Sequence, residues 1–80
     1  MTERASIQVD AATAFEVRAN GETHPVAAGA TVADFLVAHD LDTKLVVVER
    51  NGRILTRAAL GETRLEPGDE LEIVHFVGGG

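Results

Sequence analysis

Apolar and polar positions alternate where the regular part of the chain begins. Residues 15–19 read Phe-Glu-Val-Arg-Ala, and this period of two is typical of a half-buried strand. The pair Asn20-Gly21 follows and favours a two-residue hairpin turn, because both positions of that turn need positive φ. Residues 22–26 are therefore expected to return antiparallel. Pro25 has no N–H group to donate, so this second strand is expected at a sheet edge.

The spacing of apolar residues then changes from two to between three and four. This spacing predicts a short amphipathic helix over residues 32–39. Thr31 is expected to be its N-cap, with Asp34 three residues later as the second member of a capping box. Leu41 is expected to pack just after the end of the helix.

A second hairpin is predicted after the helix. Residues 45–48 are apolar on both faces, which indicates an interior strand. Asn51-Gly52 is another hairpin signal, and residues 53–55 form the short return strand.

The end of the chain predicts one more strand after an irregular crossing. Residues 56–66 have no clear period, with room for a single turn around 58–60. Glu66-Pro67-Gly68-Asp69 predicts a tight turn with proline at its second position. Residues 71–77 then form the last strand.

The order of these elements predicts an α+β fold of the β-grasp, or ubiquitin-like, type. A single helix against one sheet is the economical way to bury the apolar faces. We expect a mixed sheet of four to five strands on one main helix, with the first and last strands parallel at its centre. Residues 13–77 would form this domain, residues 1–12 a disordered N-terminal extension, and residues 78–80 a flexible glycine tail.

Size and composition favour a carrier or binding module over a free-standing enzyme. A chain of 80 residues forms one small domain, with no room for a deep substrate cavity. No apolar run approaches the length of a membrane span, and the N-terminus has no apolar signal core, so we expect a cytoplasmic protein without membrane contact. The sequence has no cysteine, which excludes disulfides, thiolate metal sites and sulfur carriage on its own thiol.

The net charge of −6 bears on the choice of partner. A negative protein repels the phosphate backbone of nucleic acids, so we expect no nucleic-acid partner. The same charge suits docking onto a basic protein surface.

The chain closes with the glycine run 78–80, which is a poor way to finish a folded domain, because glycine packs no side chain and loses the most backbone entropy. Two interpretations stay open from these residues alone. The run is either a frayed chain end, or a slim arm that carries the carboxylate of Gly80 into the active site of another protein.

Several motifs occur in order over residues 14–80 and bear on this choice. They are Asn20-Gly21-Glu22, Thr31-Val32-Ala33-Asp34-Phe35-Leu36, Val46-Val47-Val48-Glu49-Arg50-Asn51-Gly52, and Pro67-Gly68-Asp69 leading into Glu72-Ile73-Val74-His75-Phe76-Val77-Gly78-Gly79-Gly80. With these motifs the chain resembles the ThiS family, the sulfur carrier proteins of thiamine biosynthesis. A terminal Gly-Gly alone is shared with the small subunit of molybdopterin synthase (MoaD-like) and with ubiquitin-like modifiers. The closing segment together with residues 49–52 favours the thiamine branch.

The resemblance implies a protein co-substrate, not an enzyme, with no bound cofactor. An E1-like adenylyltransferase would use ATP to activate the Gly80 carboxylate, and a persulfide on a sulfur-donor protein would convert it to a thiocarboxylate. Thiazole synthase would accept the sulfur. This scheme is chemically reasonable, because a carboxylate is a poor electrophile until it gains a leaving group, and a tethered sulfur has a high effective concentration.

The candidate site residues lie at the tail and on the last strand. Gly80 would carry the reaction, and Gly78 and Gly79 would provide reach. The period of two implies that, if Leu71 and Ile73 face the core, other residues of the strand face outward as an apolar docking surface. The expected partner-binding residues are Phe76, Val77, Val74, Val47 and Glu72.

Other interpretations of these residues remain open. Phe76 could fold over the core edge as a structural residue. His24, His39 and His75 lie on different elements without a short ligand spacing, so we expect no metal site. A MoaD-like subunit and a ubiquitin-like modifier or interaction module are the alternative functions.

Overall fold

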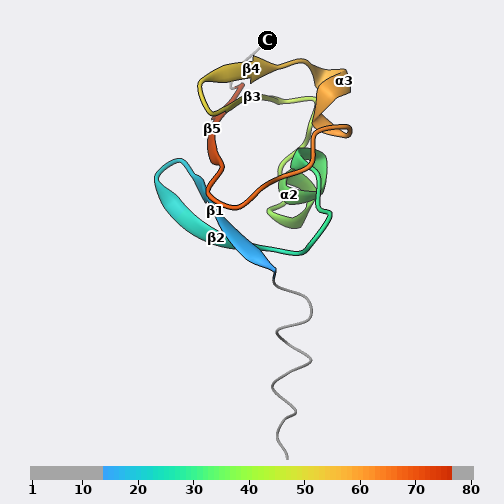
Figure 1. Ribbon diagram of the computed structural model, residues 1–80. Coiled ribbons are helices and arrows are strands. Elements are labelled where there is room, and N and C mark those ends of the chain that lie inside the picture. Colours follow the sequence, from blue (N-terminus) through green and yellow to red (C-terminus); the bar gives the residue numbers. More distant parts are fainter. Residues whose placement is uncertain (1–13, 77–80) are drawn as a thin grey trace, which may run out of the picture.

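The computed structural model describes residues 14–76. The predicted extension 1–12 and the predicted tail 78–80, with Val77, lie outside the described residues. The described elements are β1 (Phe15–Ala19), β2 (Glu22–Val26), α2 (Val32–Ala38), β3 (Val46–Arg50), β4 (Arg53–Leu55), α3 (Arg57–Leu60) and β5 (Glu70–His75) (Figure 1).

The strands form one mixed sheet in the order β2-β1-β5-β3-β4. β1 and β5 pair in parallel at the centre, and the other neighbours pair antiparallel. Figure 1 shows the sheet curving around α2, with α3 beside the β4 end. The predicted β-grasp fold and the central parallel pair are confirmed, and the sheet has five strands.

Both predicted hairpin turns are confirmed by backbone geometry. φ is positive at Asn20 (50°) and Gly21 (84°), and again at Asn51 (52°) and Gly52 (86°). Positive φ at both central residues fits the turn type whose twist matches that of the flanking strands. β2, which contains Pro25, lies at the sheet edge as predicted.

The capping box that begins α2 is also present. The Thr31 hydroxyl accepts a hydrogen bond from the Asp34 N–H (3.1 Å), and the Asp34 carboxylate accepts one from the Thr31 N–H (2.9 Å). α2 ends at Ala38, one residue earlier than predicted, because His39 is its C-cap. The single turn expected near residues 58–60 is α3.

The core lies between the sheet and the two helices. Val32 and Leu36 of α2 are fully buried, and Val17 of β1, Val48 of β3 and Leu71 of β5 lie opposite them at 2% exposure or less. Leu41 packs against this core after the helix, as predicted. None of the helices among residues 14–76 is long and apolar enough to cross a membrane.

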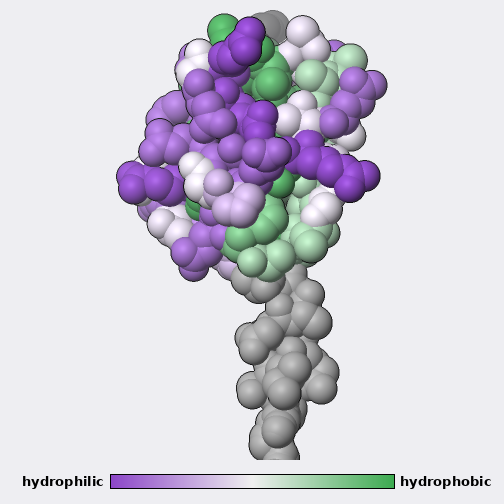
Figure 2. All heavy atoms as spheres, viewed as in Figure 1, coloured by the Kyte–Doolittle hydropathy of each residue, from purple (hydrophilic) through white to green (hydrophobic). Residues whose placement is uncertain are grey.

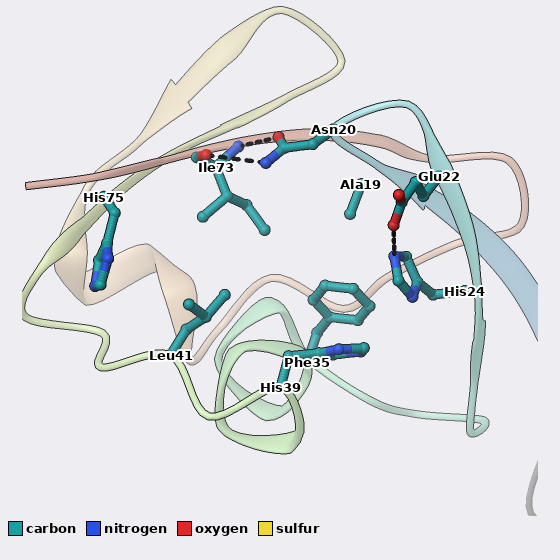
Figure 3. Close-up of a pocket in the computed structure, with 9 residues that line it drawn as sticks. All are labelled: Ala19, Asn20, Glu22, His24, Phe35, His39, Leu41, Ile73 and His75. Atoms are coloured by element: carbon teal, nitrogen blue, oxygen red, sulfur yellow. Dashed lines mark hydrogen bonds and ion pairs between the residues drawn. The ribbon is translucent and has the colours of Figure 1, made fainter.

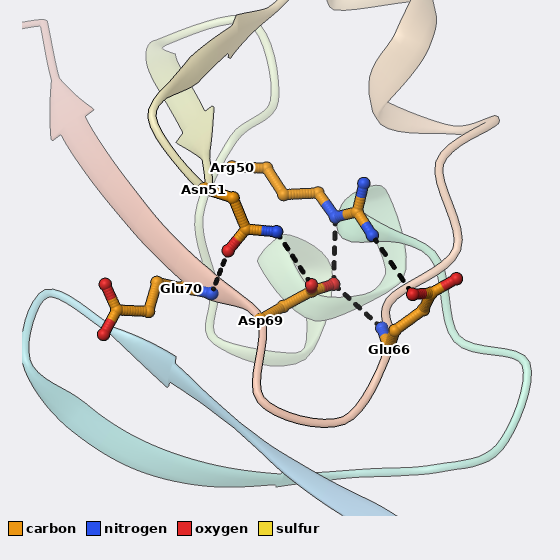
Figure 4. Close-up of polar contacts among 5 residues, drawn as sticks. All are labelled: Arg50, Asn51, Glu66, Asp69 and Glu70. Atoms are coloured by element: carbon orange, nitrogen blue, oxygen red, sulfur yellow. Dashed lines mark hydrogen bonds and ion pairs between the residues drawn. The ribbon is translucent and has the colours of Figure 1, made fainter.

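A buried carboxylate ties the β3–β4 turn to the loop before β5 (Figure 4). Asp69 is 5% exposed and accepts hydrogen bonds from Arg50 Nε (2.9 Å), Asn51 Nδ2 (3.0 Å) and the Glu66 N–H (2.8 Å). Burial by itself raises the pKa of Asp69, but the bonds from Asn51, Glu66 and Arg50 and the Arg50 charge outweigh burial and lower that pKa below its usual value. The start of β5 is therefore fixed in place.

Candidate functional site

The last strand has one buried face and one exposed face. Leu71 is buried and Ile73 is half-buried against the core, whereas the side chains of Val74 and Phe76 are 59% and 54% exposed. The period of two therefore places these residues as the sequence predicts. Phe76 does not fold over the core edge.

Five apolar side chains share this exposed side of the sheet, and we call them the docking face. Val47 lies opposite Val74. Phe76 lies opposite Leu45 in the same register, because the Phe76 N–H donates a hydrogen bond to the Leu45 carbonyl oxygen (2.7 Å). Ile54 of β4 lies opposite Glu49 on the same side and is 68% exposed. The docking face consists of Leu45, Val47, Ile54, Val74 and Phe76.

Sequence reasoning named three members of the docking face and missed Leu45 and Ile54. The signal for Leu45 was the period of two itself, because Leu45, directly before β3, alternates with Val47. The place of Ile54 depends on its register with β3, which the sequence does not show.

Carboxylates border the docking face on the side away from Phe76. Glu72 lies directly opposite Glu49, and both lie on the same side of the sheet as Val74. Figure 2 shows, on one side of the molecule, hydrophilic residues over the middle and hydrophobic ones both near the end where β4 lies and at the opposite end. An apolar patch with an acidic border suits a partner surface that has an apolar centre and a basic rim.

The three histidines line one hollow, although they are far apart in the sequence. His24 on β2, His39 at the C-cap of α2 and His75 on β5 line one hollow of about 270 Å³ (Figure 3). The ring centroids of His24 and His39 are 4.8 Å apart, and Phe35 lies against both rings. Sequence reasoning missed this hollow because it depends on tertiary contacts between separate elements.

The hollow has no arrangement typical of a metal centre. Within the described part of the chain, no three His, Asp or Glu side chains are placed to hold a metal ion. Glu22 is the carboxylate beside His24, with 3.9 Å between Oε1 and Nε2. The hollow also lies on the helix side of the sheet, away from the docking face.

The reactive tail predicted at Gly78, Gly79 and Gly80 lies outside the described residues, as does Val77. The described chain ends at Phe76, which the hydrogen bond to Leu45 fixes next to β3. The tail therefore follows directly from the central strand of the sheet. The roles of Gly80 and of the partner-binding residues stay predictions.

Comparisons with known proteins agree with this geometry. The family model described as ThiS family matches residues 12–80. The sulfur carrier protein ThiS of Bacillus subtilis is 46% identical over 50 residues, which cover 62% of this chain and 76% of that protein. The crystal structure of a thiamine biosynthesis protein (ThiS) from Geobacter metallireducens has a TM-score of 0.70 at 33% identity, and the match covers 82% of this chain and all of that one.

One further relative is much longer than this chain. A thiazole synthase of Magnetococcus marinus is 37% identical over 65 residues, which cover 81% of this chain but 20% of that protein. The chain thus spans about one fifth of the length of this relative.

The fold, with a central last strand that leads into a glycine tail, defines a β-grasp carrier domain. The chain belongs to the ThiS family of small sulfur carriers in thiamine biosynthesis. This membership confirms the prediction of a sulfur carrier for this chain.

Proposed function

We propose that this chain carries sulfur for thiazole formation on the carboxylate of Gly80. The docking face is the observation that carries this proposal. It is continuous with β5, because Val74 lies on that strand and Phe76 directly follows it, so a protein bound there would be close to the chain end, four residues beyond Phe76 in the sequence. The division into an extension 1–12, a domain 13–77 and a tail 78–80 is part of the proposal.

The chemistry begins with an E1-like adenylyltransferase. An oxygen of the Gly80 carboxylate attacks the α-phosphorus of ATP, and pyrophosphate leaves. The terminal sulfur of a persulfide on the donor protein then attacks the acyl carbon, and AMP leaves. A second thiol of the donor reduces the resulting acyl disulfide, which frees the thiocarboxylate and leaves the donor as a disulfide.

Thiazole synthase is the proposed acceptor of the sulfur. A relative with that name contains, within one polypeptide, a segment similar to this chain. Fusion of two modules raises their effective concentration, which favours modules that act in consecutive steps. The proposal needs no catalytic side chain and no bound cofactor on the carrier, because ATP is used by the activating enzyme.

Intact-mass spectrometry tests the proposal. Incubation with the activating enzyme, ATP and a persulfide donor is expected to raise the mass by about 16 Da, the exchange of one oxygen for sulfur. Deletion of Gly79-Gly80 is the matched control, which should keep the far-ultraviolet circular dichroism spectrum and lose the mass shift. An unchanged wild-type mass, or an isopeptide bond to a lysine instead, would contradict sulfur carriage.

The docking face is tested separately from the chemistry. Phe76→Ala removes a half-exposed ring and is expected to weaken binding of the activating enzyme by about tenfold or more. Thermal unfolding should change little, because the ring is outside the core. A large loss of stability with unchanged affinity would show that Phe76 is structural.

The choice between partners needs its own comparison. Pull-down with thiazole synthase and with the large subunit of molybdopterin synthase should favour the former. Preference for the latter would contradict the thiamine assignment and leave the sulfur chemistry intact.

A further inference from the structure

β5 is held unequally along its two edges. On one side, β3 pairs with it at five positions from Leu71 to His75, and the bond from Phe76 to Leu45 extends that support. On the other side, the parallel register with β1 covers only Glu70 and Leu71. Among residues 14–76, no strand therefore lies on the β1 side of the second half of β5.

The side chain of Asn20 takes the place of the missing strand (Figure 3). Its Oδ1 accepts a hydrogen bond from the Ile73 N–H (2.8 Å), and its Nδ2 donates one to the Ile73 carbonyl oxygen (3.2 Å). The Asn20 N–H donates to the Leu71 carbonyl oxygen (2.9 Å). A carboxamide has the donor and acceptor of a peptide group, so this side chain extends the β1 ladder by one step.

This contact is the last support on that edge within residues 14–76. In β5, every second residue directs its N–H and C=O groups toward β3, as the bond from Phe76 to Leu45 shows. The N–H and C=O groups of the residues between them, Leu71, Ile73 and His75, therefore face the β1 side. The Leu71 carbonyl oxygen accepts a hydrogen bond from the Asn20 N–H, and the main chain of Ile73 bonds to the Asn20 side chain. For His75, no main-chain hydrogen bond on that side occurs among the described residues.

The turn itself does not need the carboxamide. The φ of Asn20 is 50°, which glycine adopts at least as readily as asparagine. The hydrogen bonds to Ile73 thus have a role separate from turn formation.

We propose that Asn20 is a positioning residue for the reactive tail. Its bonds to Ile73 hold the second half of β5 on the edge that faces β1, so that Phe76, after which the tail begins, keeps its position when a partner binds the docking face. This inference rests on the proposed function and adds to it. Small errors in the placement of a reacting group reduce rate more than affinity.

Asn20→Gly tests the role, because it keeps the positive φ and removes both bonds to Ile73. Asn51→Gly is the matched control. Asn51 has the same place in the other hairpin turn, with φ 52°. Its side chain bonds to Glu70 and Asp69 at the start of β5, the end opposite Phe76. Both variants are assayed at a temperature at which circular dichroism shows them folded.

The measurement is pyrophosphate release by the activating enzyme with the carrier as varied substrate. For Asn20→Gly we expect kcat to fall about three- to tenfold with KM within about twofold, because Ile54 and Val47 of the docking face are unchanged. Hydrogen exchange of the Ile73 amide should be about tenfold faster. Asn20→Asp keeps the acceptor for the Ile73 N–H and should give an intermediate kcat, and Asn51→Gly should keep the wild-type kcat.

Two results would overturn the positioning role. One is a wild-type kcat in Asn20→Gly despite faster exchange at Ile73. The other is an equal fall of kcat in Asn20→Gly and Asn51→Gly, which would indicate a general effect of lost stability. No reaction of the wild-type protein would contradict the proposed function itself, and the positioning role would fall with it.

Discussion

Replacement of Asp69 by asparagine should remove much of the stability of this domain. The side chain keeps its size but loses its charge. In the wild type, N–H groups of Arg50, Asn51 and Glu66 donate to the carboxylate oxygens, and in the variant the NH2 group must face at least one of these donors. At least one donor then loses its partner in a site that is 5% exposed.

The magnitude follows from the bonds in this site. A hydrogen bond to a charged group contributes about 1.5–3 kcal/mol, and removal of one partner from a buried ion pair costs about 3–5 kcal/mol. Arg50 is only partly buried and keeps access to water and to Glu66, which is 3.9 Å away. We therefore expect Asp69→Asn to lower the free energy of unfolding by about 2–3 kcal/mol, or Tm by about 10–20 °C for a domain of this size.

The assay is urea and thermal unfolding followed by circular dichroism, since the sequence has no tryptophan or tyrosine for fluorescence. Glu70→Gln is the matched control. The Glu70 carboxylate lies 3.7 Å from Arg18 in an exposed pair, so this change should cost less than about 0.5 kcal/mol. An equally small loss for Asp69→Asn at pH 7 would refute the reasoning.

The pH dependence gives a second measurement on the same pair of proteins. Because the pKa of Asp69 is lower in the folded state, its carboxylate contributes stability above the unfolded pKa, and that stability is lost as pH falls through the folded value. The gap between wild type and Asp69→Asn should therefore be full at pH 7 and shrink below about pH 4. A gap that stays constant down to pH 2 would contradict this.

Three further changes test other parts of the structure. Thr31→Ala removes the hydroxyl of the capping box and should cost about 1 kcal/mol in urea unfolding, whereas no loss would mean that the cap is unimportant. Leu36→Ala opens a cavity at a fully buried position and should cost about 2–5 kcal/mol, so a loss below 1 kcal/mol would contradict the described core. Ile54→Ser should weaken binding of the activating enzyme by about tenfold, measured by calorimetry, while stability stays within about 1 kcal/mol. Unchanged affinity would remove Ile54 from the docking face.

The sequence predicted the fold well because its signals are local. Asn20-Gly21 and Asn51-Gly52 specify their turns by backbone preference, and Pro25 marks an edge strand by its missing donor. The residues that depend on register could not be found this way. Ile54 joins the docking face only because β4 pairs with β3 in one alignment.

The polar contacts between distant residues were not predictable either. Asn20 and Ile73 are 53 positions apart, and nothing in the composition of either segment indicates that they meet. The hollow formed by His24, His39 and His75 has the same origin, since each ring comes from a different element. The polarity of these residues is visible in the sequence, but their neighbours are not.

The position of β5 also has a consequence for synthesis on the ribosome. The last of the described strands to be made lies in the middle of the sheet, between β1 and β3. A nascent chain from which residues 70–75 have not yet emerged lacks the strand that pairs with both β1 and β3. It therefore cannot complete its hydrophobic core. Translation must therefore pass Phe76 before the core is complete, and a chain that stops before β5 should be more sensitive to proteases than the whole domain.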